Sequence, residues 1–500
     1  MVSCVIALAI GAASAFLPKE SPLGKGAWCA SLVLMAILFL WPIAIGLIGA
    51  GAASRFPLTL KYRAEYWQSC AALLRDHFLL GCGPGNFQDL YSLYKLPQAS
   101  ETIADPHNFL WEVLCNSGAA AGLLFLIALG AAALPLLRRT RSENPSSPPT
   151  LLQRSAAKQP FSLRPLLIGG ALGLLLALLL SLSSSSSFLL SFFGTLLQVG
   201  AIAAGLLFFA LRGWVLNGKL SPRAMGLLWL ALAIHFTVSG GVANPATGTL
   251  FFLLLALLQV EAPQRGWRWE NGAPFGAAIL LLFVIGGIAH YQWGYIPVLG
   301  SQAGLARAEI ARLNNNRSEE RNSLKEAAEA DPWAVSPLHQ LAQIELQQYL
   351  RDARETRPNA DALLAAAEAA SLRSPKSPAL QYELALLLLR AYLFTTQGPD
   401  RETLVETARI YLEKTVQLAP TKAAAFAYLA YAQAESGDRA AAAQSAAEAL
   451  RLDALNPHEQ YDLAREPSPV PGRSFPGWLR DVAGQSASPP SGPSTGDAAP

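Results

Sequence analysis

The chain has 500 residues, of which 52% are hydrophobic and only 15% are charged, and its formal net charge is +3. Soluble proteins contain about 25% charged residues, so this composition excludes a single soluble globular enzyme and a disordered chain. The small net charge, without a dense basic face, excludes a nucleic-acid-binding protein, and five cysteines in a chain of this length exclude a disulfide scaffold.

The charged residues divide the chain into two parts. Residues 1–300 hold 28 of the 73 Asp, Glu, Lys and Arg residues, and residues 301–500 hold the other 45. We therefore expect a membrane-embedded first part and a water-soluble second part.

Uncharged apolar windows occur throughout the first part, and roughly 20 apolar helical residues cross a bilayer. They cover residues 1–18, 26–54, 113–137, 165–211, 224–260 and 271–293. The two longest windows, 165–211 and 224–260, each provide two spans, separated by a serine run and by a Gly-Gly-Val-Ala-Asn-Pro turn. The sequence therefore predicts an all-α polytopic membrane bundle of about eight spans. Two lie in residues 1–51 and six in residues 109–293, with a polar loop at residues 52–108.

The loops predict the orientation of these spans, because Lys and Arg accumulate in cytoplasmic loops. The loop after the third span carries six basic residues between positions 138 and 164, and the other short basic loops fall on the same side. The loop at residues 52–108 and everything after residue 294 are then extracytoplasmic, in the periplasm of a multi-pass inner-membrane protein. Cleavage at the signal-peptidase-like Ala13-Ser14-Ala15 is the alternative, but it would turn the six-charge loop outward.

The soluble part, residues 294–466, contains an internal repeat. Pro332, Pro375 and Pro420 are each followed nine and ten residues later by Leu-Ala. Each unit is expected to form two Ala- and Leu-rich helices, and the pattern resembles tetratricopeptide repeats. Such repeats stack into a superhelix that binds proteins or glycans; a helical spacer without a ligand is the alternative. The Pro-, Ser- and Gly-rich residues 467–500 are predicted to be disordered.

The loop at residues 52–108 carries a set of short motifs that continue into the next span. In chain order they are Arg63-x-x-x-Trp67, Gly81-Cys82-Gly83-Pro84-Gly85-Asn86-Phe87, Asp105-Pro106-His107-Asn108 and a helix that contains Gly118. Over about residues 55–130 the set resembles the O-antigen ligase and polymerase family. These are integral membrane glycosyltransferases that take a glycan from a polyprenyl-diphosphate carrier at the outer face of the inner membrane. The resemblance implies the same activity for this chain. It does not separate ligase from polymerase, because both share the motifs.

The residue types in the loop suit this reaction. Transfer from a lipid diphosphate requires an acceptor hydroxyl to lose its proton and an anionic leaving group to be stabilised. His107 is the expected base, because imidazole is the side chain that titrates nearest to neutral pH. Arg63 is expected to hold the diphosphate, since a guanidinium keeps its charge and can bond bidentately. Further substrate-binding residues are expected at Arg75, Lys95, Asp105 and Asn108.

Several of these residues have a structural alternative. His107 and Arg63 lie near a predicted membrane boundary, where Arg63 could be an anchor within a belt of neighbouring aromatic residues. Asp105 either orients His107 or caps the helix that begins near it, and Glu101 is a weaker candidate base. The glycines of the loop are expected to form a tight turn and not a P-loop, because no Lys-Ser/Thr pair follows them.

Neither a metal nor another cofactor is expected, because the acidic residues of the loop are not at metal-ligand spacing. The expected partners are a lipid-linked glycan donor, an acceptor that is a glycan, a lipid-anchored sugar or a protein hydroxyl, and proteins that bind the repeats; no nucleic acid is expected. Cys70 and Cys82 share an oxidising side and could pair.

Two other functional classes compete with the enzyme. One is a membrane-anchored tetratricopeptide scaffold with a vestigial loop. The other is a transporter, which the absence of acidic residues within spans four to eight disfavours. Family members have several more spans before the large loop. The chain therefore either begins late or lacks helices that are dispensable.

Overall fold

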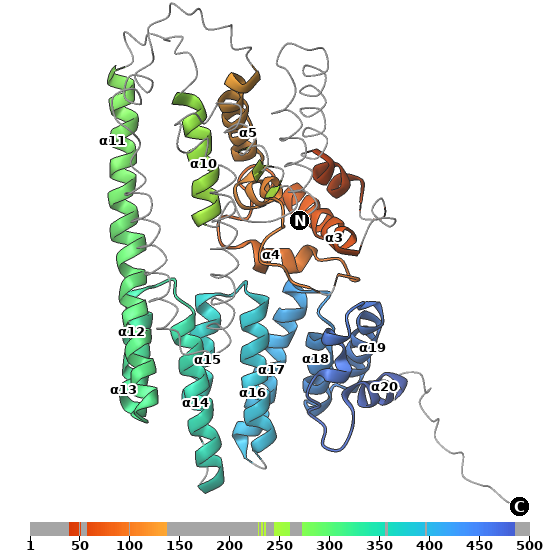
Figure 1. The fold of residues 1–500 in the computed structure, drawn as a ribbon. Coiled ribbons are helices and arrows are strands. Elements are labelled where there is room, and N and C mark those ends of the chain that lie inside the picture. The colour runs from red at the N-terminus through yellow and green to blue at the C-terminus, as the bar shows by residue number, and fades with distance from the viewer. Residues whose placement is uncertain are drawn as a thin grey trace, which may run out of the picture. The chain divides into compact units, whose positions relative to one another are not determined.

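The fold was analysed in a computed structural model. It describes residues 40–49, 51, 58–99, 101–137, 229, 232–233, 235–236, 245–260, 273–355, 359–395 and 398–485. Every regular element in these ranges is a helix, so the predicted all-α class is confirmed (Figure 1). The chain divides into two compact units. The first contains residues 1–36, 125–236 and 241–264, and the second contains residues 37–124, 237–240 and 265–500.

Three predicted spans coincide with helices of the structure. They are α5 (Phe109–Leu137), α10 (Pro245–Val260) and α11 (Ala273–His290). Within the described ranges one helical segment, Phe109–Leu129 of α5, is long and apolar enough to cross a membrane. The other predicted spans lie outside the described residues except for short stretches such as the helical residues 40–48. The number of eight spans therefore stays a prediction.

The described part of the first unit packs around aromatic side chains. Phe251 of α10 is fully buried, and its ring centroid lies 5.3 Å from that of Trp229 and 5.5 Å from that of Phe236. Both neighbours are buried as well.

In the second unit, the predicted polar loop has a hydrophobic core of its own. Its helices α3 (Leu58–Asp76) and α4 (Phe87–Tyr94) precede α5. The buried side chains of this loop core include Trp67 and Leu73 from α3, Phe87 and Tyr91 from α4, and Trp111 from α5. Burying each such side chain contributes about 1.5–3 kcal/mol. The loop is therefore a folded element with fixed side-chain positions.

The residues before α3 complete this core. Trp41 packs edge-on against Trp67, with 5.4 Å between ring centroids. Trp111 donates its indole N–H to the carbonyl of Pro42 at 3.2 Å. The second predicted span is thus joined to the loop core by packing and by a hydrogen bond.

Helix α11 continues without a break into the C-terminal helical domain. A π-helical turn, η2 (Tyr291–Tyr295), connects it to α12 (Ile296–Leu313). Tyr291, Trp293 and Tyr295 in this turn are all at least half exposed. Exposed aromatic residues of this kind are typical of the membrane–water interface, where the last span is predicted to end.

In the described residues, seven α-helices follow α12 as far as residue 455. They are α13 (Arg317–Ala330), α14 (Ser336–Glu355), α15 (Asp361–Arg373), α16 (Pro378–Phe394), α17 (Pro399–Leu418), α18 (Ala423–Glu435) and α19 (Arg439–Leu455). Each predicted repeat unit contains two of them, α14 with α15, α16 with α17 and α18 with α19. The three Leu-Ala pairs of the repeat are buried in one continuous core. Their likeness to tetratricopeptide repeats stays a prediction.

Polar side chains define where several of these helices begin. Asn316, Ser377 and Asp438 are the N-cap residues of α13, α16 and α19, and each side chain accepts a bond from a backbone N–H in the first turn. Such caps satisfy donors that have no partner within the helix.

The boundary predicted at residue 466 is too early. After the 3₁₀ turns η3 (Glu459–Tyr461) and η4 (Leu463–Arg465), helix α20 (Phe475–Gln485) packs on the C-terminal core. Phe475 and Leu479 are almost completely buried, and the Phe475 ring lies 5.0 Å from that of Tyr428. These apolar residues keep the segment folded although its surroundings are rich in Pro and Ser. Residues 486–500 lie outside the described ranges.

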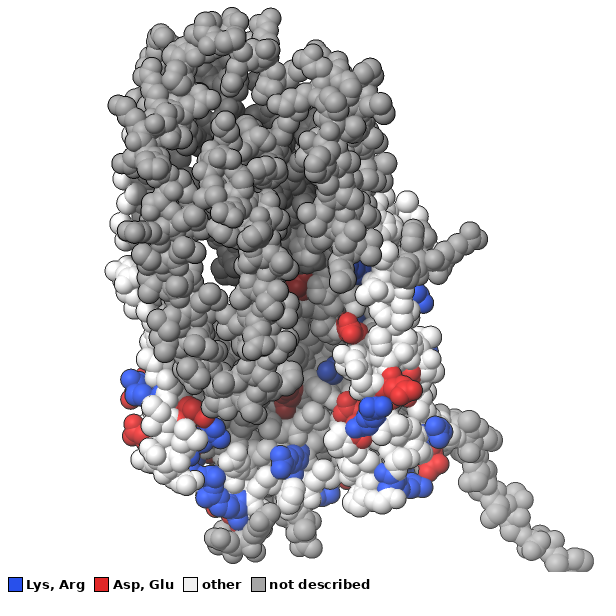
Figure 2. Space-filling view, in the orientation of Figure 1, with Lys and Arg blue, Asp and Glu red and all other residues white. Residues whose placement is uncertain are grey.

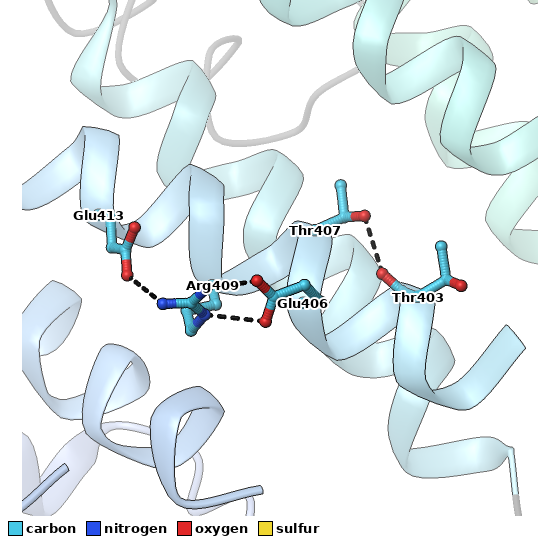
Figure 3. Close-up of polar contacts among 5 residues, drawn as sticks. All are labelled: Thr403, Glu406, Thr407, Arg409 and Glu413. Atoms are coloured by element: carbon cyan, nitrogen blue, oxygen red, sulfur yellow. Dashed lines mark hydrogen bonds and ion pairs between the residues drawn. The ribbon is translucent and has the colours of Figure 1, made fainter. Parts of the chain in front are cut away.

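The surface of the C-terminal helices carries mixed charges. In the view of Figure 2, positive and negative side chains are interspersed over the described surface. Figure 3 shows one example on α17, where Arg409 bonds both Glu406 and Glu413 one turn away on either side. Nearby, the Thr407 hydroxyl donates to the carbonyl of Thr403 at 2.8 Å. Pairs at this spacing stabilise a helix by about 0.2–0.5 kcal/mol each, so their role is structural.

Candidate active site

Helix α3 presents the first site residues on one face. Arg63, Tyr66, Trp67 and Cys70 follow the i, i+3, i+4, i+7 spacing that aligns side chains along a helix. Trp67 and Cys70 are fully buried and Tyr66 is 6% exposed, whereas Arg63 is half-buried. Tyr66 and Trp67 thus belong to the loop core.

Trp67 fixes the second part of the site onto this helix. Its indole N–H donates to the carbonyl of Pro106 at 3.1 Å. The adjacent Asn108 is fully buried, and its side-chain oxygen accepts from the backbone N–H groups of Leu110 and Trp111 at 2.9 and 3.0 Å. Asn108, predicted to bind substrate, therefore caps the start of α5.

Asp105 and His107 form a hydrogen-bonded pair between these two anchors. Nδ1 of His107 lies 3.0 Å from Oδ1 of Asp105, and the backbone N–H of His107 donates to the same oxygen at 2.7 Å. A proton on Nδ1 leaves Nε2 as the acceptor. Since Asn108 caps the helix, Asp105 is free for the other function considered from the sequence, which is to orient His107.

The backbone at His107 is strained. Its φ angle is +51°, in the left-handed region that costs a residue with a Cβ atom roughly 1–2 kcal/mol. Strain of this size is retained where the surroundings fix the conformation, and it is concentrated at functional sites.

Charge is concentrated around this pair. The hydrogen bond from His107 and the positive charge of Arg63 hold the pKa of Asp105 below its usual value. Burial lowers the pKa of Arg63, while the interaction with Tyr66 and the negative charge of Asp105 act in the opposite direction. A guanidinium titrates so far above neutral pH that Arg63 keeps its charge. The site thus holds a cation, a carboxylate and an imidazole together.

Tyr66 is a member of this cluster that the sequence did not place in it, and it is joined there by Glu101, the weaker candidate base. The Tyr66 hydroxyl donates to a carboxylate oxygen of Glu101 at 2.7 Å, and the Tyr66 and His107 rings lie 6.1 Å apart. Burial and the bond to Glu101 raise the pKa of Tyr66, so its phenol remains protonated. The spacing of Tyr66 from Arg63, one helical turn, was the signal available in the sequence.

The glycine-rich turn docks on a kink in α5. Gly118 has φ +78° and ψ 177°, which interrupts the helix. The N–H groups of Cys82 and Gly83 donate to the carbonyls of Cys115 and Asn116 at 2.7 and 3.0 Å. The predicted tight turn is therefore present, and it joins the loop to helix α5 through backbone bonds.

The structure also places two other predicted substrate-binding residues, Arg75 and Lys95. Arg75 is exposed in the last turn of α3, twelve residues or about 18 Å along the helix from Arg63. Lys95 follows α4 and is 9% exposed. Burial, together with the charge of Lys422, lowers the pKa of Lys95 to about 8. The structure brings Arg63, Asp105 and His107 together, and their substrate roles remain predictions, as do those of Arg75, Lys95 and Asn108.

The cysteines of the loop are not bonded to one another. Cys70, Cys82 and Cys115 are all free thiols. Cys70 and Cys115 are buried side by side, with the Cys115 thiol 3.9 Å from the Cys70 carbonyl. The pairing of Cys70 with Cys82 that the sequence left open is not present.

Residues 1–126 match the family described as O-antigen ligase. The matched range includes Arg63, Tyr66, Asp105 and His107, as well as the kink at Gly118. A search of curated proteins found no match for the chain.

Proposed function

We propose, from the premise that residues 1–126 belong to the O-antigen ligase family, that this chain transfers a glycan from a polyprenyl-diphosphate carrier to an acceptor hydroxyl. Membership in the family supports a bacterial inner-membrane protein with a glycan-transfer function. The proposed topology has eight spans, with the loop at residues 52–108 and the C-terminal helices in the periplasm. The charge distribution of the loops supports this orientation.

The observation that carries the proposal is the Asp105–His107 pair beside Arg63 at the start of α5. Asp105 holds the proton on Nδ1 of His107, so Nε2 is available as a base. α5 is also the described helix that is apolar and long enough to cross a membrane. A lipid-borne donor would therefore reach the site from the bilayer while a water-soluble acceptor reached it from the periplasm.

The proposed reaction uses these groups in one displacement. The acceptor hydroxyl oxygen attacks the anomeric carbon of the donor sugar as Nε2 of His107 takes its proton. The bond between that carbon and the diphosphate oxygen breaks, and its electron pair leaves with the diphosphate. Arg63 stabilises the added negative charge, a contribution that is typically several kcal/mol when the charge is fixed in advance. Ligase and polymerase reactions share this step.

The test compares membranes that carry the wild-type chain, His107→Ala and His77→Ala, each supplied with a polyprenyl-diphosphate-linked glycan. His77 is the matched control, because it lies on the same loop with its ring 6.5 Å from that of Tyr94. We expect glycan transfer by the wild type and by His77→Ala, and a loss of about 10²–10⁴-fold in His107→Ala. Transfer that persists in His107→Ala would contradict the proposed base.

The same membranes separate the other two classes. A scaffold would lose its function on deletion of residues 301–466 and keep it in His107→Ala. A transporter would move solute without consuming the lipid-linked glycan. Either result, together with no glycan transfer by the wild type, would overturn the proposed enzymatic function.

A further inference from the structure

A short segment near the end of the C-terminal helical domain is held in a fixed shape. Asn456 bonds the backbone of His458 in both directions, donating to its carbonyl at 2.9 Å and accepting from its N–H at 3.1 Å. Asp453 accepts the N–H of Leu463 at 2.8 Å, and the Leu463 side chain is fully buried. The segment of residues 456–463, which we name the aromatic segment, is therefore anchored at both ends.

The aromatic segment contacts helix α3 beside the candidate active site. His458 lies against Tyr62, with 4.9 Å between ring centroids and 48° between the ring planes. Tyr461 follows at 6.4 Å from His458, nearly perpendicular to it. All three residues belong to the same compact unit. Tyr62 directly precedes Arg63, so this row of rings begins next to the residue proposed to hold the diphosphate.

Electrostatic interactions agree with this placement. His458 interacts with Glu65, a carboxylate that is only 3% exposed, and Tyr461 interacts with Tyr66. Glu65 and Tyr66 lie one residue apart on the turn of α3 that follows Arg63. Two residues of the aromatic segment therefore face the same turn of α3.

The row of rings is not closed off by the protein. Tyr461 is 47% exposed, and the neighbouring Glu459 and Gln460 are exposed as well. Exposed aromatic rings with adjacent polar groups are characteristic of ligand-binding surfaces. The C–H face of a sugar ring packs on an aromatic ring, and its hydroxyls bond to carboxylates and amides. This combination fits a carbohydrate better than a lipid chain, which would need a continuous apolar surface.

We infer that Tyr62, His458 and Tyr461 form a sugar-binding surface that continues the active site onto the C-terminal helical domain. The inference rests on the proposed glycan transfer and specifies where a sugar ring is held. The ligand is a sugar residue, either of the lipid-linked donor beyond its diphosphate or of the incoming acceptor. In this arrangement the C-terminal domain positions substrate and is more than a spacer.

The test uses the full chain purified in detergent, with a polyprenyl-diphosphate-linked oligosaccharide as donor and a free oligosaccharide as acceptor. KM and kcat are measured for Tyr461→Ala, Tyr62→Ala and the ring-retaining Tyr461→Phe. Trp333→Ala is the matched control, because Trp333 is an aromatic residue of the same domain that is 83% exposed. One substrate is varied while the other is saturating, so that donor and acceptor binding are separated.

We expect Tyr461→Ala and Tyr62→Ala to raise one KM about tenfold with a smaller change in kcat, as expected for a lost ring contact. Tyr461→Phe, which keeps the ring, should have a KM close to that of the wild type. A higher KM for the donor assigns the surface to the donor glycan, and a higher KM for the acceptor assigns it to the acceptor. If the wild type is active and Tyr461→Ala and Trp333→Ala have the same KM values as the wild type, the inference is overturned and the proposed function is not. An inactive wild type would overturn the proposed function.

Binding provides a second measurement that does not depend on turnover. Retention of the fluorescently labelled oligosaccharide is compared between His107→Ala and the double variant His107→Ala/Tyr461→Ala. Weaker retention by the double variant is expected. Equal retention of both would overturn the inference even if a kinetic effect were seen.

Discussion

At the scale of single residues, the pairing of Asp105 with His107 determines which nitrogen of the imidazole can act as a base. The carboxylate lies 3.0 Å from Nδ1 and also accepts the backbone N–H of His107. Its pKa is held below the usual value by these contacts and by Arg63, so it stays ionised throughout the range in which a histidine changes protonation. The carboxylate can therefore hold the proton on Nδ1 at neutral pH.

Removing the Asp105 charge is expected to slow transfer strongly. Asp105→Asn keeps the size of the side chain but presents an N–H or a weaker acceptor to Nδ1, so the imidazole loses its fixed tautomer. We expect kcat to fall by about 10²-fold or more, by analogy with other carboxylate–histidine pairs. Asp76→Asn is the matched control, because Asp76 is an exposed carboxylate that accepts the hydroxyl of Tyr94. An equal loss in both variants would show that Asp105 acts only in folding.

Because the backbone of His107 is left-handed, substitutions at this position should change stability and activity independently. A glycine tolerates φ +51° and an alanine does not. We expect His107→Gly to be more stable than His107→Ala by about 1 kcal/mol, with both inactive, as measured by thermal unfolding and glycan transfer. Asn315, with φ +54° in the turn before α13, is the control. Asn315→Gly and Asn315→Ala should differ by a similar amount while both stay active. Equal stability of the His107 variants would contradict the strain.

At the scale of elements, the glycine turn and the kinked helix α5 fit together backbone to backbone. A Cβ atom on Gly118 would lie 2.1 Å from the carbonyl oxygen of Leu79, and one on Gly81 would lie 2.5 Å from that of Cys115. Both glycines also have positive φ angles. The two segments can approach this closely only because neither position carries a side chain.

Substitution at either glycine should therefore separate the turn from the helix. We expect Gly118→Ala and Gly81→Ala each to lower the free energy of unfolding by about 3 kcal/mol or more, from steric overlap and from backbone strain. Gly286→Ala in α11 is the control, since a Cβ atom there meets nothing within 4 Å. Thermal unfolding in detergent measures the difference. Wild-type stability of Gly118→Ala would show that the turn does not dock on α5.

The junction between α4 and the C-terminal helices predicts a pH dependence of stability. Asp89 of α4 accepts a hydrogen bond from the Ser377 hydroxyl at 2.9 Å. At the end of the same helix, burial and the charge of Lys422 lower the pKa of Lys95 to about 8. Between pH 8 and the pKa of an exposed lysine, about 10.4, the unfolded chain binds more protons than the folded chain. Stability linked to Lys95 therefore rises with pH across this window and is constant below it.

Replacing Lys95 should remove that rise. Between pH 8 and pH 10 we expect the unfolding temperature of the wild type to rise relative to that of Lys95→Met. Each kcal/mol gained in the free energy of unfolding should raise it by about 2–4 °C. Lys376→Met makes the same change at an exposed position of the C-terminal domain and should leave the pH dependence as in the wild type. Parallel curves for the wild type and Lys95→Met would contradict the shifted pKa of Lys95.

At the scale of the whole molecule, the sequence predicted those features that depend on local patterns. The all-helical class, the two helices in each repeat unit and the presence of Asp105 next to His107 follow from periodicity and from motif residues close together in the chain. Tyr66 and Glu101 are 35 residues apart, and the contact of Tyr62 with His458 spans most of the chain. Local patterns carry no information about such pairs, which form only when separate segments pack.

The predicted disordered tail illustrates the same limit in the opposite direction. The Pro-, Ser- and Gly-rich composition after residue 466 indicated disorder, but Phe475, Trp478, Leu479 and Val482 lie at helical spacing within it. Three of them are buried against the C-terminal core. A short amphipathic helix is stable when a folded surface is available to bury its apolar face, and composition averaged over a long window does not reveal this.

The central claim is that His107 promotes transfer of a glycan away from a lipid diphosphate, and the most direct test counts both products. Purified wild type, His77→Ala and His107→Ala are incubated with a polyprenyl-diphosphate-linked glycan and an acceptor. Released polyprenyl diphosphate and newly formed glycosidic bonds are then measured together. We expect one released carrier diphosphate for each new bond in the wild type and in His77→Ala, with both products lost in parallel in His107→Ala. New bonds without released carrier diphosphate, or undiminished release by His107→Ala, would contradict the claim.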